Sequence, residues 1–277
     1  MSDILIGTSG YDYPEWKGVF YPPEVKRADF LLYYSTKFNA VELNNTFYNM
    51  PTQERILSFY ERSEGRLQFS IKANRLLTHE VNFQWQTAAD DFKKALNPLL
   101  AKDVLSAVLF QFPESFHYTD ENRIYLSKLI AAFEGFPVVI EFRHKEWIRE
   151  SVFQGLVQRK VSLAFCDMPD LKNLPKITVI NPAGSADFFP FPGPNAYIRL
   201  HGRNVNAWYS NIVSPADSKN NGASRYLYDY SDSELESFVP VIQNAVILNR
   251  RVQVFFNNHP NGNGARNALK LKNMIQK

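Results

Sequence analysis

The sequence alternates short strand-like segments with helix-like segments from end to end, and eight such pairs can be counted. This alternation predicts a parallel sheet with helical crossovers. The predicted strands cover 4–7, 40–44, 67–72, 104–110, 138–142, 161–166, 196–200 and 252–256. Several are continuous apolar runs, as expected for strands buried on both faces. Eight pairs in 277 residues predict an α/β fold, a TIM-type (β/α)8 barrel, with one domain over 1–277.

The helical segments show apolar residues at three- and four-residue spacing, as in Leu235, Phe238 and Ile242. Ser231 with Glu234 predicts a capping box at the start of that segment, and Pro240 predicts a kink or a shorter helix. Two stretches, 167–195 and 202–230, break the alternation after the sixth and seventh strands. We expect long loops over the ligand-binding mouth of the barrel, with partly disordered padding as the alternative.

The N-terminal segment lacks the basic and apolar regions of a signal peptide, and no apolar run is long enough to span a membrane. The default expectation is a cytoplasmic protein with no membrane partner. Cys166 is the single cysteine, which excludes an internal disulfide and a thiolate metal cage. The net charge of +3 comes from scattered Lys and Arg residues, so it permits a nucleic-acid partner without predicting one.

Polar side chains recur at the ends of the predicted strands. Successive strand residues point to opposite faces, so position parity sorts the residues that face the barrel axis. The axial set from five strands is Glu42, Asn44, Lys72, Glu141, Arg143, Arg199, His201 and Asn257. Barrel enzymes assemble their sites from several strand ends, so this convergence is the main functional signal. After the first strand, Tyr11 and Trp16 are aromatic residues that would wall a pocket.

The same charges also permit a purely structural interpretation. Pairing of Glu42 with Arg199, or of Glu141 with Arg143, would form a buried ion layer that satisfies itself. Packed barrel interiors favour branched apolar residues, and burying charges costs several kcal/mol unless they are well paired. We therefore favour a functional site.

Five segments carry a family resemblance, in order along the chain: IGTSGY at 6–11, VELN with TFY at 41–48, EFRH with Trp147 at 141–147, RLHG at 199–202, and FNNH at 256–259. In these segments the chain resembles the YecE-like proteins, the family filed as domain of unknown function 72. The resemblance implies a TIM-type barrel and supplies no chemistry. The stretch 167–195 matches the family pattern least well.

A glycosidase needs two carboxylates flanking the scissile bond, and Glu42 with Glu141 are the candidates. Common barrel glycosidases carry these groups after strands four and seven, where this chain has Gln111 and Arg199, so this hypothesis fits poorly. A metal-dependent barrel of the xylose isomerase or endonuclease IV type is a second alternative. Its candidate ligands are Glu42, Glu141, Asp167, His201 and His259. The adjacent cations argue against a multi-metal cluster; a single divalent metal is left open but not favoured, and no cofactor is predicted.

The polar side chains at the strand ends best fit a small anionic ligand, phosphorylated or carboxylated, with sugar-like molecules among the candidates. Lys72, Arg143, Arg199 and His201 would grip the anion, and Glu42 or Glu141 would accept a proton. Asn44 and Asn257 would orient hydroxyl groups. The non-enzymatic alternative is nucleic acid, with bases stacked on Tyr11, Trp16, Trp208 and Tyr209. The sequence leaves the oligomeric state open.

Overall fold

A computed structural model describes residues 4–175, 191–209, 224–248 and 250–276. In this part of the chain, eight parallel strands lie side by side in the order β1-β8-β7-β6-β5-β4-β3-β2. They are β1 (Ile4–Thr8), β2 (Ala40–Leu43), β3 (Gln68–Lys72), β4 (Leu105–Gln111), β5 (Val138–Glu141), β6 (Ser162–Asp167), β7 (Asn195–Leu200) and β8 (Arg251–Phe256). Each predicted strand is within one residue of the observed one at both ends, and the predicted barrel is confirmed.

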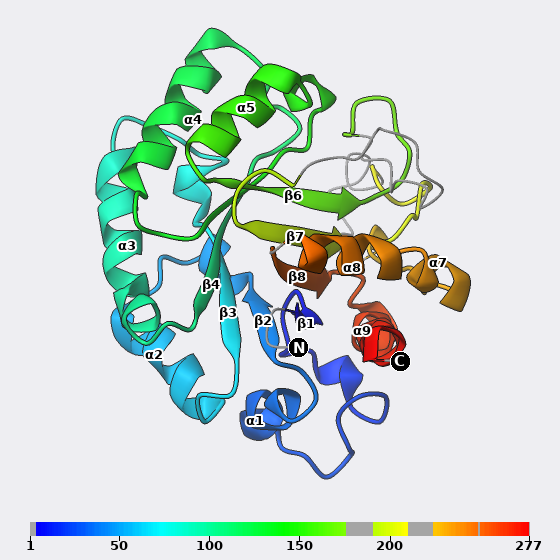
Figure 1. The fold of residues 1–277 in the computed structure, drawn as a ribbon. Coiled ribbons are helices and arrows are strands. Elements are labelled where there is room, and N and C mark those ends of the chain that lie inside the picture. Colours follow the sequence, from blue (N-terminus) through cyan, green and yellow to red (C-terminus); the bar gives the residue numbers. More distant parts are fainter. Residues whose placement is uncertain (1–3, 176–190, 210–223, 249, 277) are drawn as a thin grey trace.

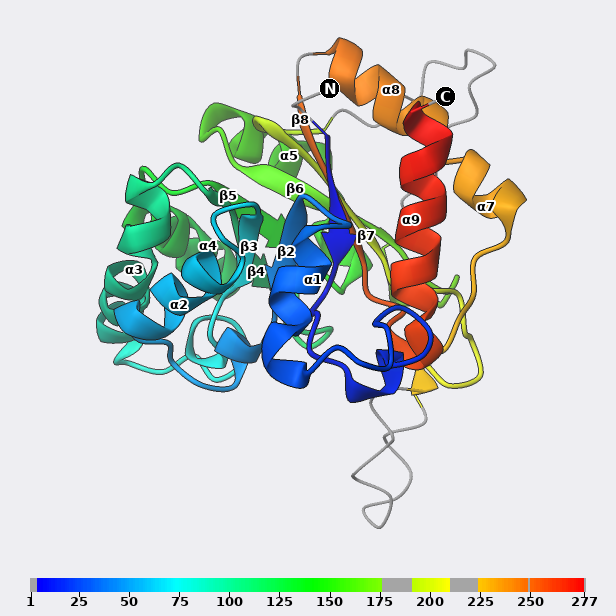
Figure 2. The same ribbon diagram turned by 90° about the horizontal axis from the view of Figure 1, so that it is seen from below.

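The helices surround the strands (Figure 1). They are α1 (Phe30–Ser35), α2 (Gln53–Arg62), α3 (Trp85–Ala101), α4 (Asp120–Ala132), α5 (Glu150–Gln158), α7 (Asp232–Glu236), α8 (Val239–Ile247) and α9 (Asn263–Gln276). Figure 2 shows α9 running along the barrel beside β1 and β8, which it contacts. No helix of the described residues is long and apolar enough to cross a membrane.

Side chains complete the barrel between β1 and β2. A backbone bridge joins Ser9 to Glu42 near the carboxyl ends. Below it, the Asn39 amide accepts from Ile6 N at 2.9 Å and donates to Ile4 O at 2.8 Å, as a strand peptide would. Between these two points, Tyr34 from α1 takes the place of a direct backbone hydrogen bond. Its hydroxyl accepts from Thr8 N at 2.8 Å and donates to Ala40 O at 3.0 Å.

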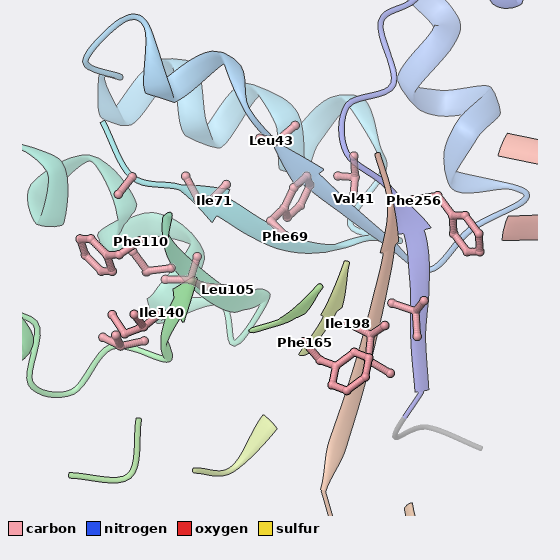
Figure 3. Packing of buried hydrophobic residues seen from close by; sticks show 14 of the residues in the cluster. Val41, Leu43, Phe69, Ile71, Leu105, Phe110, Ile140, Phe165, Ile198 and Phe256 are labelled. Atoms are coloured by element: carbon pink, nitrogen blue, oxygen red, sulfur yellow. The ribbon is translucent and has the colours of Figure 1, made fainter. Parts of the chain in front are cut away.

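The buried apolar residues form two layers. The larger layer lies between strands and helices, and Figure 3 shows members such as Val41, Phe69 and Ile140 on the outward strand faces. The smaller layer fills the barrel interior and consists of Leu5, Ala40, Ala107, Leu109, Val139, Ala164, Cys166, Tyr197 and Phe255. Because side chains alternate along each strand, the interior residues point the same way as Glu42, Glu141 and Arg199. The apolar interior therefore lies directly beneath a polar layer at the carboxyl ends.

The last helical segment of the predicted pattern is divided in two. Ser231 and Glu234 form the predicted capping box at the start of α7. Pro240 stands in the first turn of α8, where its missing N–H removes no helical hydrogen bond. The predicted interruption at Pro240 is confirmed. Of the two predicted long loops, residues 176–190 and 210–223 lie outside the described residues.

Candidate functional site

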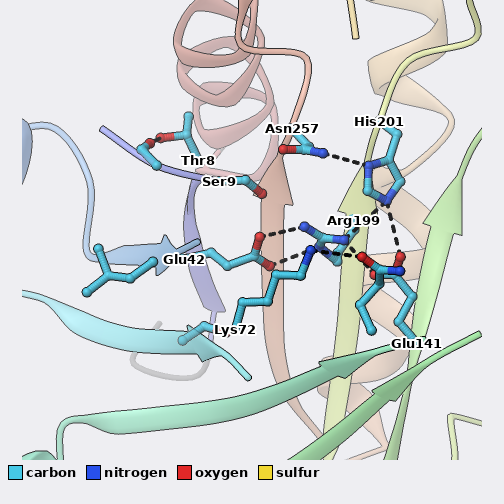
Figure 4. Close-up of polar contacts among 12 residues, drawn as sticks. Thr8, Ser9, Glu42, Lys72, Glu141, Arg199, His201 and Asn257 are labelled. Atoms are coloured by element: carbon cyan, nitrogen blue, oxygen red, sulfur yellow. Dashed lines mark hydrogen bonds and ion pairs between the residues drawn. The ribbon is translucent and has the colours of Figure 1, made fainter. Parts of the chain in front are cut away.

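The polar side chains predicted to face the barrel axis meet at the carboxyl ends of the strands. Figure 4 shows Glu42, Lys72, Glu141, Arg199 and His201 gathered inside the barrel. Glu42, Glu141 and His201 have no exposed surface, and 2% of Arg199 is exposed. The parity argument is confirmed for these residues. The site is a buried cluster of charges rather than a set of side chains extended into solvent.

Arg199 is the centre of this cluster. Its Nε and Nη2 donate to the two oxygens of Glu42, at 2.9 and 2.6 Å. Its Nη1 donates to Oε2 of Glu141 at 2.6 Å, and Nε of Arg143 donates to Oε1 of the same carboxylate. Two of these pairings, Glu42 with Arg199 and Glu141 with Arg143, are the ones that the structural interpretation of the sequence anticipated, and the bond from Arg199 to Glu141 joins them into one cluster. Arg199 therefore holds two carboxylates in place, and each of its three nitrogens donates to one of them.

Both carboxylates are held in the ionised form. Burial by itself would raise the pKa of Glu42, but the charge of Arg199 and hydrogen bonds from Arg199 and Tyr197 outweigh burial, and the pKa lies below its ordinary value. For Glu141 burial is likewise outweighed, by the charges of Arg143 and Arg199, and the pKa lies far below its ordinary value. Carboxylates this acidic are poor proton acceptors near neutral pH.

His201 is neutral and oriented. Burial lowers its pKa well below the ordinary value, and the charges of Arg143 and Arg199 lower it further. Nη2 of Arg143 lies 3.1 Å from His201 Nε2, and a guanidinium can only donate, so Nε2 carries the lone pair. The proton is then on Nδ1, which lies 2.9 Å from the Asn257 amide. That amide must turn its oxygen to Nδ1.

In this cluster, Lys72 is the cation for which the described residues supply no carboxylate hydrogen bond. Its Nζ donates to Oε1 of Gln111 at 2.8 Å and lies 4.3 Å from the centre of the Phe47 ring. Burial lowers the pKa of Lys72, and the positive charge of Arg199 lowers it further, to about 7. An amine with this pKa exchanges a proton near neutral pH, unlike the two carboxylates.

The comparisons with known proteins agree with the fold. A sequence model described as "Protein of unknown function DUF72" matches residues 5–277. The chain belongs to the DUF72 family. The UPF0759 protein YunF of Bacillus subtilis (strain 168) is 27% identical, over 98% of this chain and 94% of that protein. A DUF72 family protein from Thermotoga maritima has a crystal structure with a TM-score of 0.81 and 30% identity, covering 99% of both chains. One from Enterococcus faecalis is 23% identical with a TM-score of 0.81, over 99% of this chain and 96% of that one, and supports the fold. The resemblance seen in the sequence is confirmed, and the function has to be argued from the site of this DUF72 protein.

Three polar residues of the DUF72 site were missed by the sequence argument. Tyr197 donates to Oε2 of Glu42 at 2.7 Å and lies 2.6 Å from Oγ of Ser70. Gln111 holds Lys72. Tyr197 stands two positions before Arg199 on the same strand, so the parity used for Arg199 would also have found it. Its aromatic ring made it look like an ordinary core residue.

Residues from the described part of 202–230 cover the mouth. The Trp208 ring lies 6.4 Å from the His201 ring, and the Arg143 guanidinium lies 5.8 Å from the centre of Trp208. The Tyr226 ring lies 5.9 Å from the His201 ring and 6.3 Å from the Trp208 ring. These contacts agree with the prediction that this stretch lies over the barrel mouth.

Three aromatic residues that were predicted to wall a pocket or to stack on bases are buried instead. Trp16 is fully buried, Tyr11 is 7% exposed and Trp208 is 4% exposed. Trp16 donates through Nε1 to the carbonyl of His259 at 2.8 Å, and Tyr11 packs edge-on to Phe59. Both anchor the segment after β1 to its neighbours, because aromatic rings supply more buried area than a loop of small residues. They do not present faces for ligand or base stacking.

Asn44 also differs from the prediction. β2 ends at Leu43, and Asn44 has helical backbone angles at the start of the 3₁₀ helix Asn45–Phe47, so it does not continue the alternation of the strand. Its Oδ1 is buried without a hydrogen-bond partner in the described part of the chain. Asn257, by contrast, lies where parity places it, against His201.

The three carboxylates among the candidate metal ligands have other partners. Glu42 and Glu141 bind guanidinium groups, and Asp167 accepts from Arg203 at 2.8 Å and from the Tyr230 hydroxyl at 2.6 Å. The His259 ring stacks on Tyr13 at 4.5 Å. Cys166 comes within 4.8 Å of Glu141 and His201. A cation there would face Arg143 and Arg199 at short range, which opposes its binding. Burial raises the pKa of Cys166, so its thiol stays protonated.

Proposed function

We propose that the mouth of this DUF72 barrel binds a small anion, phosphorylated or carboxylated, between Lys72 and Arg143. The observation that supports this most directly is the surroundings of Lys72. The side chain of this lysine is partly buried, and its hydrogen-bond partner is the neutral amide of Gln111. An ammonium group that is partly removed from water is stabilised by an anion. The neighbouring carboxylates of Glu42 and Glu141 are already bound to arginines.

The charges support the same conclusion. Glu42 and Glu141 carry two negative charges, which Arg199 and Arg143 balance. Protonated Lys72 therefore leaves the cluster with one excess positive charge. A bound anion would compensate for it, and the pKa of Lys72 would rise as the anion binds. Binding should consequently take up a proton when the pH is above about 7.

This arrangement changes the roles assigned from the sequence. Glu42 and Glu141 position Arg199 and Arg143, and their low pKa values make them unsuitable proton acceptors. Lys72 is the group that donates or accepts a proton on the ligand. His201, held neutral, orients Arg143 through Nε2. Arg143 is 11% exposed and has donors beyond those that bind Glu141 and His201, so it can contact the ligand.

The nucleic-acid alternative is less well supported. Of the four aromatic residues expected to stack on bases, Tyr11, Trp16 and Trp208 are buried, and Tyr209 is 38% exposed. Stacking needs an accessible ring face. The alternative is tested by the salt dependence of binding, because contacts to a phosphate backbone weaken steeply between low and physiological salt.

The proposal is tested by calorimetric titration with sulfate at constant ionic strength. Sulfate keeps its charge between pH 6 and 9, so a pH dependence reports on the protein. We expect binding at pH 6.5 that weakens progressively toward pH 9, with a heat that varies with the ionisation heat of the buffer. Lys72→Met should weaken it at least tenfold. The matched control is Lys94→Met, which removes a lysine that is 70% exposed on α3.

Equal affinity in the wild type and Lys72→Met would overturn the proposal, as would the absence of sulfate binding at millimolar concentration. The variant Arg143→Gln distinguishes the contribution of Arg143 to binding from that of Lys72. It keeps a hydrogen-bonding group near Glu141 and removes the charge. Weakened binding in this variant with a preserved pH dependence is the expected result, because Lys72 is the group that titrates.

A further inference from the structure

A second cluster of ligating side chains lies outside the charge cluster of the mouth. His117 follows Phe116 in the loop between β4 and α4, and His144 and Glu146 lie in the loop between β5 and α5. Figure 1 shows α4 and α5 beside each other, and the two loops lead into them. One donor atom from each of the three side chains lies within 4.8 Å of the others.

The distances suit a small metal ion. His117 Nδ1 and His144 Nδ1 each lie 3.5 Å from Oε2 of Glu146. In a tetrahedral zinc site with bonds of about 2.0–2.1 Å, the ligand atoms are about 3.3 Å apart. Two of the three required separations are therefore nearly correct. The third separation joins the ligand nitrogens of His117 and His144. The His117 side chain is 54% exposed, so it is free to turn and adjust this distance.

His144 Nδ1 is a hydrogen-bond acceptor, so it has a lone pair that can be offered to an ion. The backbone N–H of Glu146 donates to His144 Nδ1 at 3.4 Å, so this nitrogen is unprotonated. A hydrogen bond of this length is weak and is readily exchanged for a metal bond. The Glu146 carboxylate is in turn oriented by the backbone N–H of Tyr118, 3.4 Å from Oε2.

Aromatic packing fixes the positions of the two loops relative to each other. The Trp147 ring stacks on Phe116 at 5.1 Å and on Phe142 at 4.4 Å, with interplanar angles of 4° in both pairs. Trp147 Nε1 also donates to Phe116 O at 2.6 Å. The ligands flank these residues in sequence: His117 follows Phe116, and Glu146 precedes Trp147. The backbone positions of the ligands are thus set before any ion binds, which lowers the cost of ordering them.

We propose that His117, His144 and Glu146 form a binding site for a transition-metal ion of the zinc class. Imidazole and carboxylate are ligands that Zn²⁺ accepts, and three protein ligands leave a coordination position for water. Glu146 is 42% exposed, so the ion reaches the site from solvent. The bound ion ties the loop before α4 to the loop before α5.

The test uses the full-length chain without a histidine tag, after treatment with a chelator. Competition with a chromogenic chelator at pH 7.5 measures the affinity for Zn²⁺, and thermal unfolding measures the stabilisation. We expect one ion per chain and a higher melting temperature with Zn²⁺. His117→Ala and Glu146→Gln should each weaken binding at least tenfold and abolish the shift. Both residues are substantially exposed, so the variants should fold, and circular dichroism checks this.

Two control variants separate this site from the mouth. His79→Ala removes a histidine outside the cluster and should leave the affinity unchanged. Cys166→Ser removes a ligand from the other group of metal-ligating residues, the one with Glu141 and His201. Binding that survives in the His117→Ala and Glu146→Gln double variant, or is lost in Cys166→Ser, would overturn the proposal. So would a wild-type chain that binds no Zn²⁺.

Discussion

Arg199 on β7 and Glu42 on β2 form a bidentate pair through the barrel interior, with hydrogen bonds of 2.9 and 2.6 Å. The third nitrogen of the guanidinium binds Glu141 on β5. One side chain thus connects three strands that are not neighbours in the sheet. Because 2% or less of each of these side chains is exposed, their charges depend on one another for stabilisation.

We expect Arg199→Met to lower the free energy of unfolding by about 3–5 kcal/mol at pH 7, because it leaves two buried carboxylates without their common partner. Urea unfolding followed by circular dichroism measures this. The matched control is Arg27→Ala, since Arg27 binds Asp12 with two hydrogen bonds of 2.7 and 3.0 Å at the surface. An exposed pair is screened by water, so this variant should be nearly as stable as the wild type. Similar losses in both variants would contradict the argument.

The stability difference between the wild type and Arg199→Met should shrink as the pH falls. In the wild type, the pKa values of Glu42 and Glu141 lie below the ordinary 4.5, so the stability they contribute is present above pH 4.5 and is lost at lower pH. In the variant, burial raises the pKa of Glu42, and its protonation relieves the penalty as the pH approaches 4.5. Urea unfolding at pH 7, 5.5 and 4 tests this. A difference that stays constant over this range would mean that Arg199 acts through packing alone.

Lys72→Met should stabilise the protein at pH 6, by about 1–4 kcal/mol, because a partly buried charge is replaced by an apolar chain of similar length. The folded pKa of Lys72 is about 7, against an ordinary value of 10.5. Between these values the unfolded chain binds more protons than the native one, so wild-type stability rises with pH. The advantage of the variant should therefore decrease from pH 7 to pH 10. The control, Lys94→Met, should show no pH-dependent difference, and a constant advantage for Lys72→Met would contradict the shifted pKa.

The barrel was predictable from the sequence because strands buried on both faces leave continuous apolar runs, and alternation places Glu42, Glu141 and Arg199 on one side. The same alternation could not show which partner each charge would choose. Arg199 was expected to face a ligand, yet it binds two carboxylates that lie 157 and 58 residues away along the chain. Long-range pairings of this kind depend on strand register and tilt. The burial of Trp16 could not be predicted either. An aromatic residue in a glycine-containing segment gives no local sign of whether its ring is buried.

The junction between β1 and β2 supplies the last prediction. The Tyr34 hydroxyl joins Thr8 N to Ala40 O. Beside it, Gly7 packs so closely against the Ala40 carbonyl that an added Cβ would lie 2.0 Å from that oxygen. Because of this close contact, the two strands cannot rearrange freely around the hydroxyl. Tyr34→Phe leaves a buried N–H and a buried carbonyl unsatisfied, so we expect a loss of about 1–3 kcal/mol.

Hydrogen exchange locates the effect of this substitution. The Thr8 amide should exchange faster in Tyr34→Phe, while amides in the β3–β4 ladder keep the protection expected from the change in global stability. Tyr48→Phe is the control, since this tyrosine is 68% exposed and its hydroxyl is free to bond with water. Unchanged protection of Thr8 in the Tyr34 variant would show that the strands close without the hydroxyl, and that the barrel junction does not depend on it.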